Sequence, residues 1–182
     1  MRKSAIVLAM LGFAAPLAAQ QPAKDSTKKD TMPYTAFANL PLKPTRQVKF
    51  TTKEGTWMSV DVSPDGKTIA FDLMGDIYTM PVEGGKATQV TKGIAYETHP
   101  RFSPDGKKIL FTSDRSGSDN IWYIDTEKKD TVQLTKEATE DFPAAVWTPD
   151  GNYIIASKGR RIPKLFLYHK DGGGGTQLTD GS

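Results

Sequence analysis

Short apolar segments bounded by turn residues recur along this chain. Three of them belong to near-copies of one phrase: VDVSPDGKTIAF at 60–71, PRFSPDGKKILF at 100–111 and AVWTPDGNYIIA at 145–156. Three copies of one phrase indicate an internal repeat, and a repeat decides the fold before any motif is treated as chemistry.

The Ser/Thr-Pro-Asp-Gly tetrapeptide in each copy predicts a tight turn between antiparallel strands. Proline presets φ for the second turn position, aspartate tolerates the third, and glycine accepts a positive φ. These residues are Pro64, Pro104 and Pro149; Asp65, Asp105 and Asp150; and Gly66, Gly106 and Gly151. We therefore interpret the three aspartates as turn residues and not as catalytic carboxylates.

Three more strands are predicted in each repeat by the apolar pattern. The strand after each turn is apolar on both faces, which indicates burial on both sides. A third and a fourth strand follow, and the glutamines of the fourth strands stand 44 residues apart each time. In chain order the second strands are 69–71, 109–111 and 154–156, the third strands are 76–80, 120–124 and 164–168, and the fourth are 88–91, 132–135 and 176–179.

A repeat of about 40 to 45 residues with four strands is typical of a β-propeller blade. One such sheet cannot bury both faces alone, whereas radially stacked sheets cover each other. We predict an all-β fold with three four-stranded antiparallel blades at about 54–92, 95–136 and 139–180.

Three blades are too few for a ring, because propellers close with about four to eight. The segment 46–52, with Gln47 to Thr51 at its centre, stands where a fourth strand stands before the second blade, yet no first three strands precede it. We predict that it is a closing strand, so that residues 46–182 form an incomplete propeller at the front of a longer protein. The alternative is a three-bladed unit that closes by pairing with a second copy.

The repeats resemble the WD40-like repeats of the TolB type, also called PD40 repeats. The resemblance runs from about Arg46 to Thr179 and rests on Ser-Pro-Asp-Gly, on Gln-Leu/Val-Thr and on FTSDRSGSDNIWYID at 111–125. The Gly-His and Trp-Asp marks of true WD40 repeats are absent. The first repeat, from EGTWMSVDVSPDG onward at 54–91, is similar to the opening of exported bacterial proteins that join such a propeller to a metal-dependent amidohydrolase domain.

The first 45 residues predict export and a tether. Arg2 and Lys3 precede an apolar run from Ala5 to Ala15, and small residues follow Pro16, which is the order of a signal peptide ending near residue 19. The apolar run is too short to span a bilayer. Residues 20–33 are polar and rich in lysine and threonine, and Pro41 and Pro44 keep the chain extended and irregular up to Thr45. We expect residues 20–45 to form a flexible linker. We expect an exported protein, periplasmic or extracellular, with no membrane anchor after cleavage.

Composition excludes several kinds of chemistry. The chain has no cysteine, so disulfides and thiolate metal sites are excluded. Its formal net charge of +3 falls to +1 without Arg2 and Lys3, and the basic residues are scattered among acidic ones. A nucleic-acid partner is not expected, because such a surface needs a dense basic face.

Candidate catalytic and ligand residues are few. The two histidines are predicted in different blades, His99 at the start of an innermost strand and His169 in an exposed turn. They do not make a catalytic zinc site, because such a site usually needs three protein ligands. The run Gly172 to Gly175 is a hairpin turn and not a phosphate cradle, because no Lys-Ser/Thr follows it. A cluster of polar residues lies in the predicted turn between the second and third strands of the second repeat, and we interpret its side chains as forming local turn hydrogen bonds and not a calcium site. Four aromatic residues stand at strand positions suited to packing between blades. The polar turn residues are Asp114, Arg115, Asp119 and Asn120, and the aromatic residues are Phe102, Trp122, Tyr123 and Trp147.

No catalytic, metal or cofactor residues are therefore expected in this chain. The resemblance implies a scaffold or binding role beside a downstream domain of the same protein, an amidohydrolase with a divalent metal. Two alternatives remain: a TolB-like propeller that binds other envelope proteins, and the gating propeller of a serine peptidase of the prolyl-oligopeptidase kind.

Overall fold

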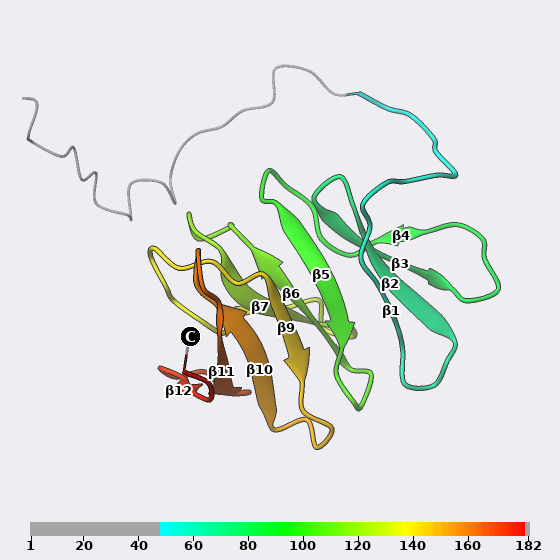
Figure 1. Cartoon of the computed structure of the whole chain (residues 1–182). Helices are drawn as coiled ribbons and strands as arrows, with labels where there is room; N and C mark the ends of the chain where they lie inside the picture. Colours follow the sequence, from blue (N-terminus) through cyan, green and yellow to red (C-terminus); the bar gives the residue numbers. More distant parts are fainter. Residues whose placement is uncertain (1–47, 181–182) are drawn as a thin grey trace, which may run out of the picture. The chain divides into compact units, whose positions relative to one another are not determined.

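The chain folds into three consecutive antiparallel sheets of four strands each (Figure 1). The computed structural model describes residues 48–180, and all regular structure within this range is strand. In each sheet the strands pair in chain order. The first sheet contains β1 (Val60–Val62), β2 (Thr68–Leu73), β3 (Asp76–Pro81) and β4 (Thr88–Gln89); the second β5 (Glu97–Phe102), β6 (Lys108–Ser113), β7 (Asn120–Asp125) and β8 (Thr131–Gln133); the third β9 (Ala144–Trp147), β10 (Tyr153–Lys158), β11 (Lys164–His169) and β12 (Thr176–Gln177). The predicted all-β fold with three blades is confirmed.

The repeated turns join the first and second strands of every blade. Their glycines have φ values of 71°, 69° and 68°, as a tight turn with a left-handed last residue requires. The aspartate has a further role that the turn pattern did not predict. Asp65 Oδ1 accepts hydrogen bonds from the Ser63 hydroxyl at 2.6 Å and from the Lys67 backbone N–H at 3.1 Å. In the third turn the Thr148 hydroxyl, followed by the Asn152 backbone N–H, lowers the pKa of Asp150 to about 2.

The turns of neighbouring blades also pack on one another. A Cβ atom on Gly106 would lie 3.6 Å from Cδ of Pro64, and one on Gly151 would lie 3.7 Å from Cδ of Pro104. The proline of one turn therefore lies against the glycine of the next, so the repeated phrase shapes the contact between blades as well as each hairpin.

The Gln-x-Thr ending of each repeat has a structural role too. The threonine hydroxyl accepts a hydrogen bond from the backbone N–H of the second residue of the third strand: Thr91 from Ile77, Thr135 from Ile121 and Thr179 from Leu165, at 2.9, 2.9 and 3.0 Å. The carbonyl of the same residue accepts a backbone hydrogen bond from the residue before the threonine, so side chain and backbone together hold the end of the outer strand.

Two hydrophobic clusters fill the spaces between the sheets. One joins Ala70 and Ile77 to Ile109, Phe111 and Ile124, and the other joins residues of the second and third sheets. In β6 every residue from Ile109 to Ser113 is buried, because a neighbouring sheet covers each face, whereas burial alternates along β2. In the second strands of the outer sheets, Ile69, Phe71 and Ile155 are only partly buried, and four apolar residues of these sheets are exposed: Val60, Val62, Val146 and Leu165. Burial on both faces is thus confirmed for the middle blade alone.

The predicted closing strand is not formed in this structure. Val48 to Thr52, the described part of the segment 46–52, belong to no strand, because a strand needs a sheet to pair with and all three sheets already have four strands. Its role in closing a ring stays a prediction. The predicted signal peptide and linker lie outside the described residues. In residues 48–180 there is no helix with the length and apolar character needed to cross a bilayer.

Candidate functional site: an apolar end on the first blade

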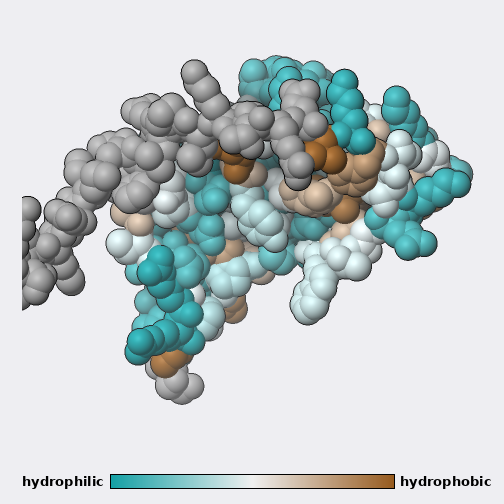
Figure 2. Space-filling model, turned by 90° about the horizontal axis from the view of Figure 1, so that it is seen from above, coloured by the Kyte–Doolittle hydropathy of each residue, from teal (hydrophilic) through white to brown (hydrophobic). Residues whose placement is uncertain are grey.

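Large apolar side chains gather at one end of the first blade. They come from the segment before β1, from the β2–β3 turn and from the β4–β5 connection, and all are exposed. We call this surface the blade-1 apolar end; it consists of Trp57, Met58, Met74, Ile94 and Tyr96. Trp57 is fully exposed and Met74 is 77% exposed. Figure 2 looks onto this end of the sheets and shows brown surface among teal.

Close backbone contacts hold the three segments together. The Gly75 carbonyl accepts a hydrogen bond from the Glu97 N–H at 2.9 Å, and a Cβ on Gly75 would lie only 3.1 Å from the Tyr96 ring. Asp72 Oδ1 accepts from the Ser59 N–H at 3.0 Å, which ties the segment before β1 to the end of β2. The apolar side chains thus project from a braced backbone.

Two of these residues have left-handed backbones that their side chains disfavour. Trp57 has a φ of 59° and Met74 a φ of 56°. A left-handed backbone conformation at a residue other than glycine costs of order 1–3 kcal/mol, and such residues cluster at functional sites. Met74 and Gly75 form the two-residue connection between the paired Leu73 and Asp76, where asparagine or aspartate is usual at the first position. A methionine at this turn position is the signal in the sequence for this surface.

An ion pair with a buried carboxylate lies at the start of β5, next to Tyr96. Glu97 is only 1% exposed, and its Oε1 pairs with the Arg115 guanidinium from the β6–β7 turn. Asp114, from the same turn, accepts a hydrogen bond from the Tyr96 N–H at 2.7 Å. A buried carboxylate needs such a partner, because an unpaired one is strongly destabilising. Asp114 and Arg115 therefore fix the β4–β5 connection through side chains that reach 18 residues back, whereas the sequence had predicted local hydrogen bonds within their own turn.

The two histidines lie in different sheets. His99 is the third residue of β5, at a bulge, with a φ of 57°, and its backbone N–H donates to Asp72 Oδ2 at 2.9 Å. His169 ends β11 and is exposed beside Asp171. In the part of the chain that the structure describes, no group of three or more His, Asp or Glu residues could hold a metal ion.

The remaining candidates have structural places. Asn120 is buried, and its side chain bonds to Ser116, Ser118, Thr135 and Glu137. Asp119 carries no such network among the hydrogen bonds of residues 48–180, and burial raises its pKa. Gly172 to Gly175 connect β11 to β12, as predicted for a hairpin. The four aromatics pack against the inter-sheet clusters, so their predicted packing role is confirmed: Phe102 and Trp122 at the first junction, Tyr123 and Trp147 at the second.

Four-stranded meanders stacked through their faces define a β-propeller, and this chain contains three of its blades. The model of the TolB beta propeller domain matches residues 38–182. The chain belongs to this family of TolB-type propellers, which confirms the resemblance drawn from the repeats.

The chain covers different shares of its individual relatives. The chain is 32% identical over 143 residues to the Tol-Pal system protein TolB of Wolinella succinogenes, covering 76% of this chain and 33% of that protein. It is 32% identical over 94 residues to tricorn protease homolog 1 of Streptomyces coelicolor, covering 52% of this chain and 9% of that protein. Among solved structures, the putative TolB from Agrobacterium tumefaciens superposes with a TM-score of 0.64 at 26% identity, covering 71% of this chain and 52% of that one. The chain therefore spans only a part of each of these relatives.

Proposed function

We propose that this chain is the propeller portion of an exported protein, and that the blade-1 apolar end holds a second folded domain against it. The carrying observation is the exposure of Trp57 and Met74 on strained backbones at one end of one blade. Exposed apolar groups gathered on one surface mark interaction sites, and strain of this kind persists only where the surroundings impose it. A docking surface explains both features at once.

The domain that we propose for this surface is a metal-dependent amidohydrolase domain of the same protein. The support is the similarity of residues 54–91 to the opening of exported propeller–amidohydrolase proteins, together with the sequence of residues 1–19, which has the order of a signal peptide. Any divalent metal would then belong to that domain. The location would be the periplasm or the cell exterior.

Two other assemblies would use the same surface. The similarity to a TolB protein favours a separate envelope protein as the partner, and the similarity to a tricorn protease homolog favours a peptidase domain. In all three cases the propeller positions a second domain or binds a partner protein, and it supplies no catalytic group.

A site-specific photo-crosslink tests the proposal. A benzophenone amino acid at Met74, in the protein produced by its own cells, is expected to link reproducibly to one folded segment. The sequence of the linked peptide identifies it: a His-x-His metal-hydrolase domain of the same chain, a separate envelope protein, or a domain with a Gly-x-Ser-x-Gly serine.

The matched control places the same photo-crosslinker at Tyr153. This residue is 39% exposed and opens β10 directly after the third turn, at the other end of its blade. Identical products from both positions, or none from position 74, would refute docking at the blade-1 apolar end.

A further inference from the structure

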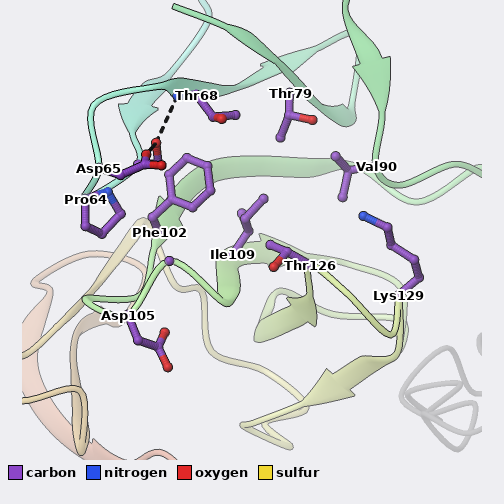
Figure 3. Close-up of a pocket in the computed structure, with 12 residues that line it drawn as sticks. Pro64, Asp65, Thr68, Thr79, Val90, Phe102, Asp105, Ile109, Thr126 and Lys129 are labelled. Atoms are coloured by element: carbon purple, nitrogen blue, oxygen red, sulfur yellow. Dashed lines mark hydrogen bonds between the residues drawn. The ribbon is translucent and has the colours of Figure 1, made fainter.

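The junction between the first and second blades contains a hollow of about 390 Å³. This size lies within the range of about 300–1,000 Å³ that is usual for small-molecule sites. The hollow lies beside the first two repeated turns, at the opposite end of the blade from the apolar end described above. Figure 3 shows Phe102 and Ile109 between Thr68 and Thr79 on one side and Thr126 and Lys129 on the other.

The second junction shows what fills this space elsewhere in the same chain. Thr79 pairs with Ala70 in β2, and Tyr123 pairs with Leu110 in the same register of the second blade. Similarly, Phe102 directly precedes the second turn as Trp147 precedes the third. At the second junction the Tyr123 and Trp147 rings lie 6.3 Å apart. At the first junction Thr79 takes the place of Tyr123, and Phe102 takes the place of Trp147. Because threonine has no ring and phenylalanine is smaller than tryptophan, a space about the size of an aromatic group stays open.

The cation at the second junction also has a counterpart. Lys108 Nζ lies 4.6 Å from the centre of the Tyr123 ring and 6.0 Å from that of Trp147. Thr68 takes the place of Lys108 at the first junction, and Lys129 reaches the hollow from the β7–β8 loop instead (Figure 3). A cation beside an aromatic face is favourable by about 0.5–2 kcal/mol. The hollow has a cation, Lys129, but at Thr79 it lacks the counterpart of the Tyr123 ring.

We propose that this hollow binds a planar aromatic group carried by a ligand. Phe102, Val90 and Ile109 give the ring an apolar surface, Lys129 gives it a cation, and the hydroxyls of Thr68 and Thr79 give a polar edge group its hydrogen bonds. A free small molecule and an aromatic side chain on a peptide share this chemistry, and both would fit the same space.

Indole is the first probe, and N-acetyl-tryptophanamide represents a peptide-borne ring. Saturation-transfer NMR on the full chain is expected to show saturable binding of indole and to show none for cyclohexanol, which has similar size and no π system. Binding of the amide as well indicates that a peptide can present the ring, and binding of indole alone indicates a free small molecule. Either result supports the site, whereas no indole binding, or equal binding of cyclohexanol, would overturn it.

The variant Thr79→Tyr copies the second blade and fills the hollow from within. It is expected to weaken indole binding at least about tenfold while raising the melting temperature, since it adds buried apolar area. Leu167→Tyr is the matched control, because Leu167 has the same register in the third blade and does not line the hollow. If Thr79→Tyr fails to fold, Thr79→Leu fills part of the same space. Unchanged indole binding in a folded Thr79 variant, or equal loss in Leu167→Tyr, would refute the assignment.

Discussion

Phe111→Ala is expected to lower the free energy of unfolding by about 3–5 kcal/mol, the range for truncating a fully buried phenylalanine. Phe111 is 1% exposed in the middle of β6, within the cluster that joins the first two blades. Its neighbours are held by the pairing of two sheets, so they cannot collapse into the cavity that alanine leaves. Urea unfolding at constant pH measures the loss.

Phe71→Ala is the matched comparison. Phe71 pairs with Tyr78 in β3 as Phe111 pairs with Trp122 in β7, but Phe71 is only half-buried because its blade has one covered face. Its truncation is expected to cost roughly half as much, in proportion to the apolar area removed from water. Equal losses at the two positions would mean that the middle blade is not covered on both sides as described.

Gly106→Val is expected to cost about 2–3 kcal/mol, the second large effect. The left-handed φ of 69° is unfavourable for a residue with a Cβ, and more so for a β-branched one. In addition, the Cβ would already be 3.6 Å from Pro64, so the methyl groups of valine would press into the preceding turn. Thermal or urea unfolding gives the value.

Two further glycine variants separate these causes. Gly66→Val has nearly the same φ but no atom within 4 Å of its Cβ, so it is expected to show the backbone strain alone. Gly174→Val has neither constraint and is expected to be close to neutral. If Gly106→Val costs no more than Gly66→Val, the turns of neighbouring blades do not stabilise one another.

The repeat made the strands, turns and core aromatics predictable from sequence, because these depend on residues within one blade. Gly66, Gly106 and Gly151 have the backbone that their tetrapeptide predicts, and Trp122 and Trp147 pack where strand periodicity puts them. The contacts of Asp72 with Ser59 and His99 were not predictable in this way, because one partner lies in another blade and bonds through its backbone.

The candidate sites were harder to find for the same reason. The hollow at the first junction results from threonines at positions 68 and 79, which look unremarkable until their register is compared with Lys108 and Tyr123. The blade-1 apolar end joins three segments that are separate in sequence. Only Met74, in a two-residue turn that prefers asparagine or aspartate, was visible as an anomaly in the chain itself.

Docking at the blade-1 apolar end is tested most directly by hydroxyl-radical footprinting of the protein in its own cells and of this 182-residue chain produced alone. The account predicts that Trp57 and Met74 are oxidised rapidly in the isolated chain and are protected several-fold in the cells, while Tyr153 reacts equally in both. Equal oxidation of Trp57 and Met74 in the two states would contradict it.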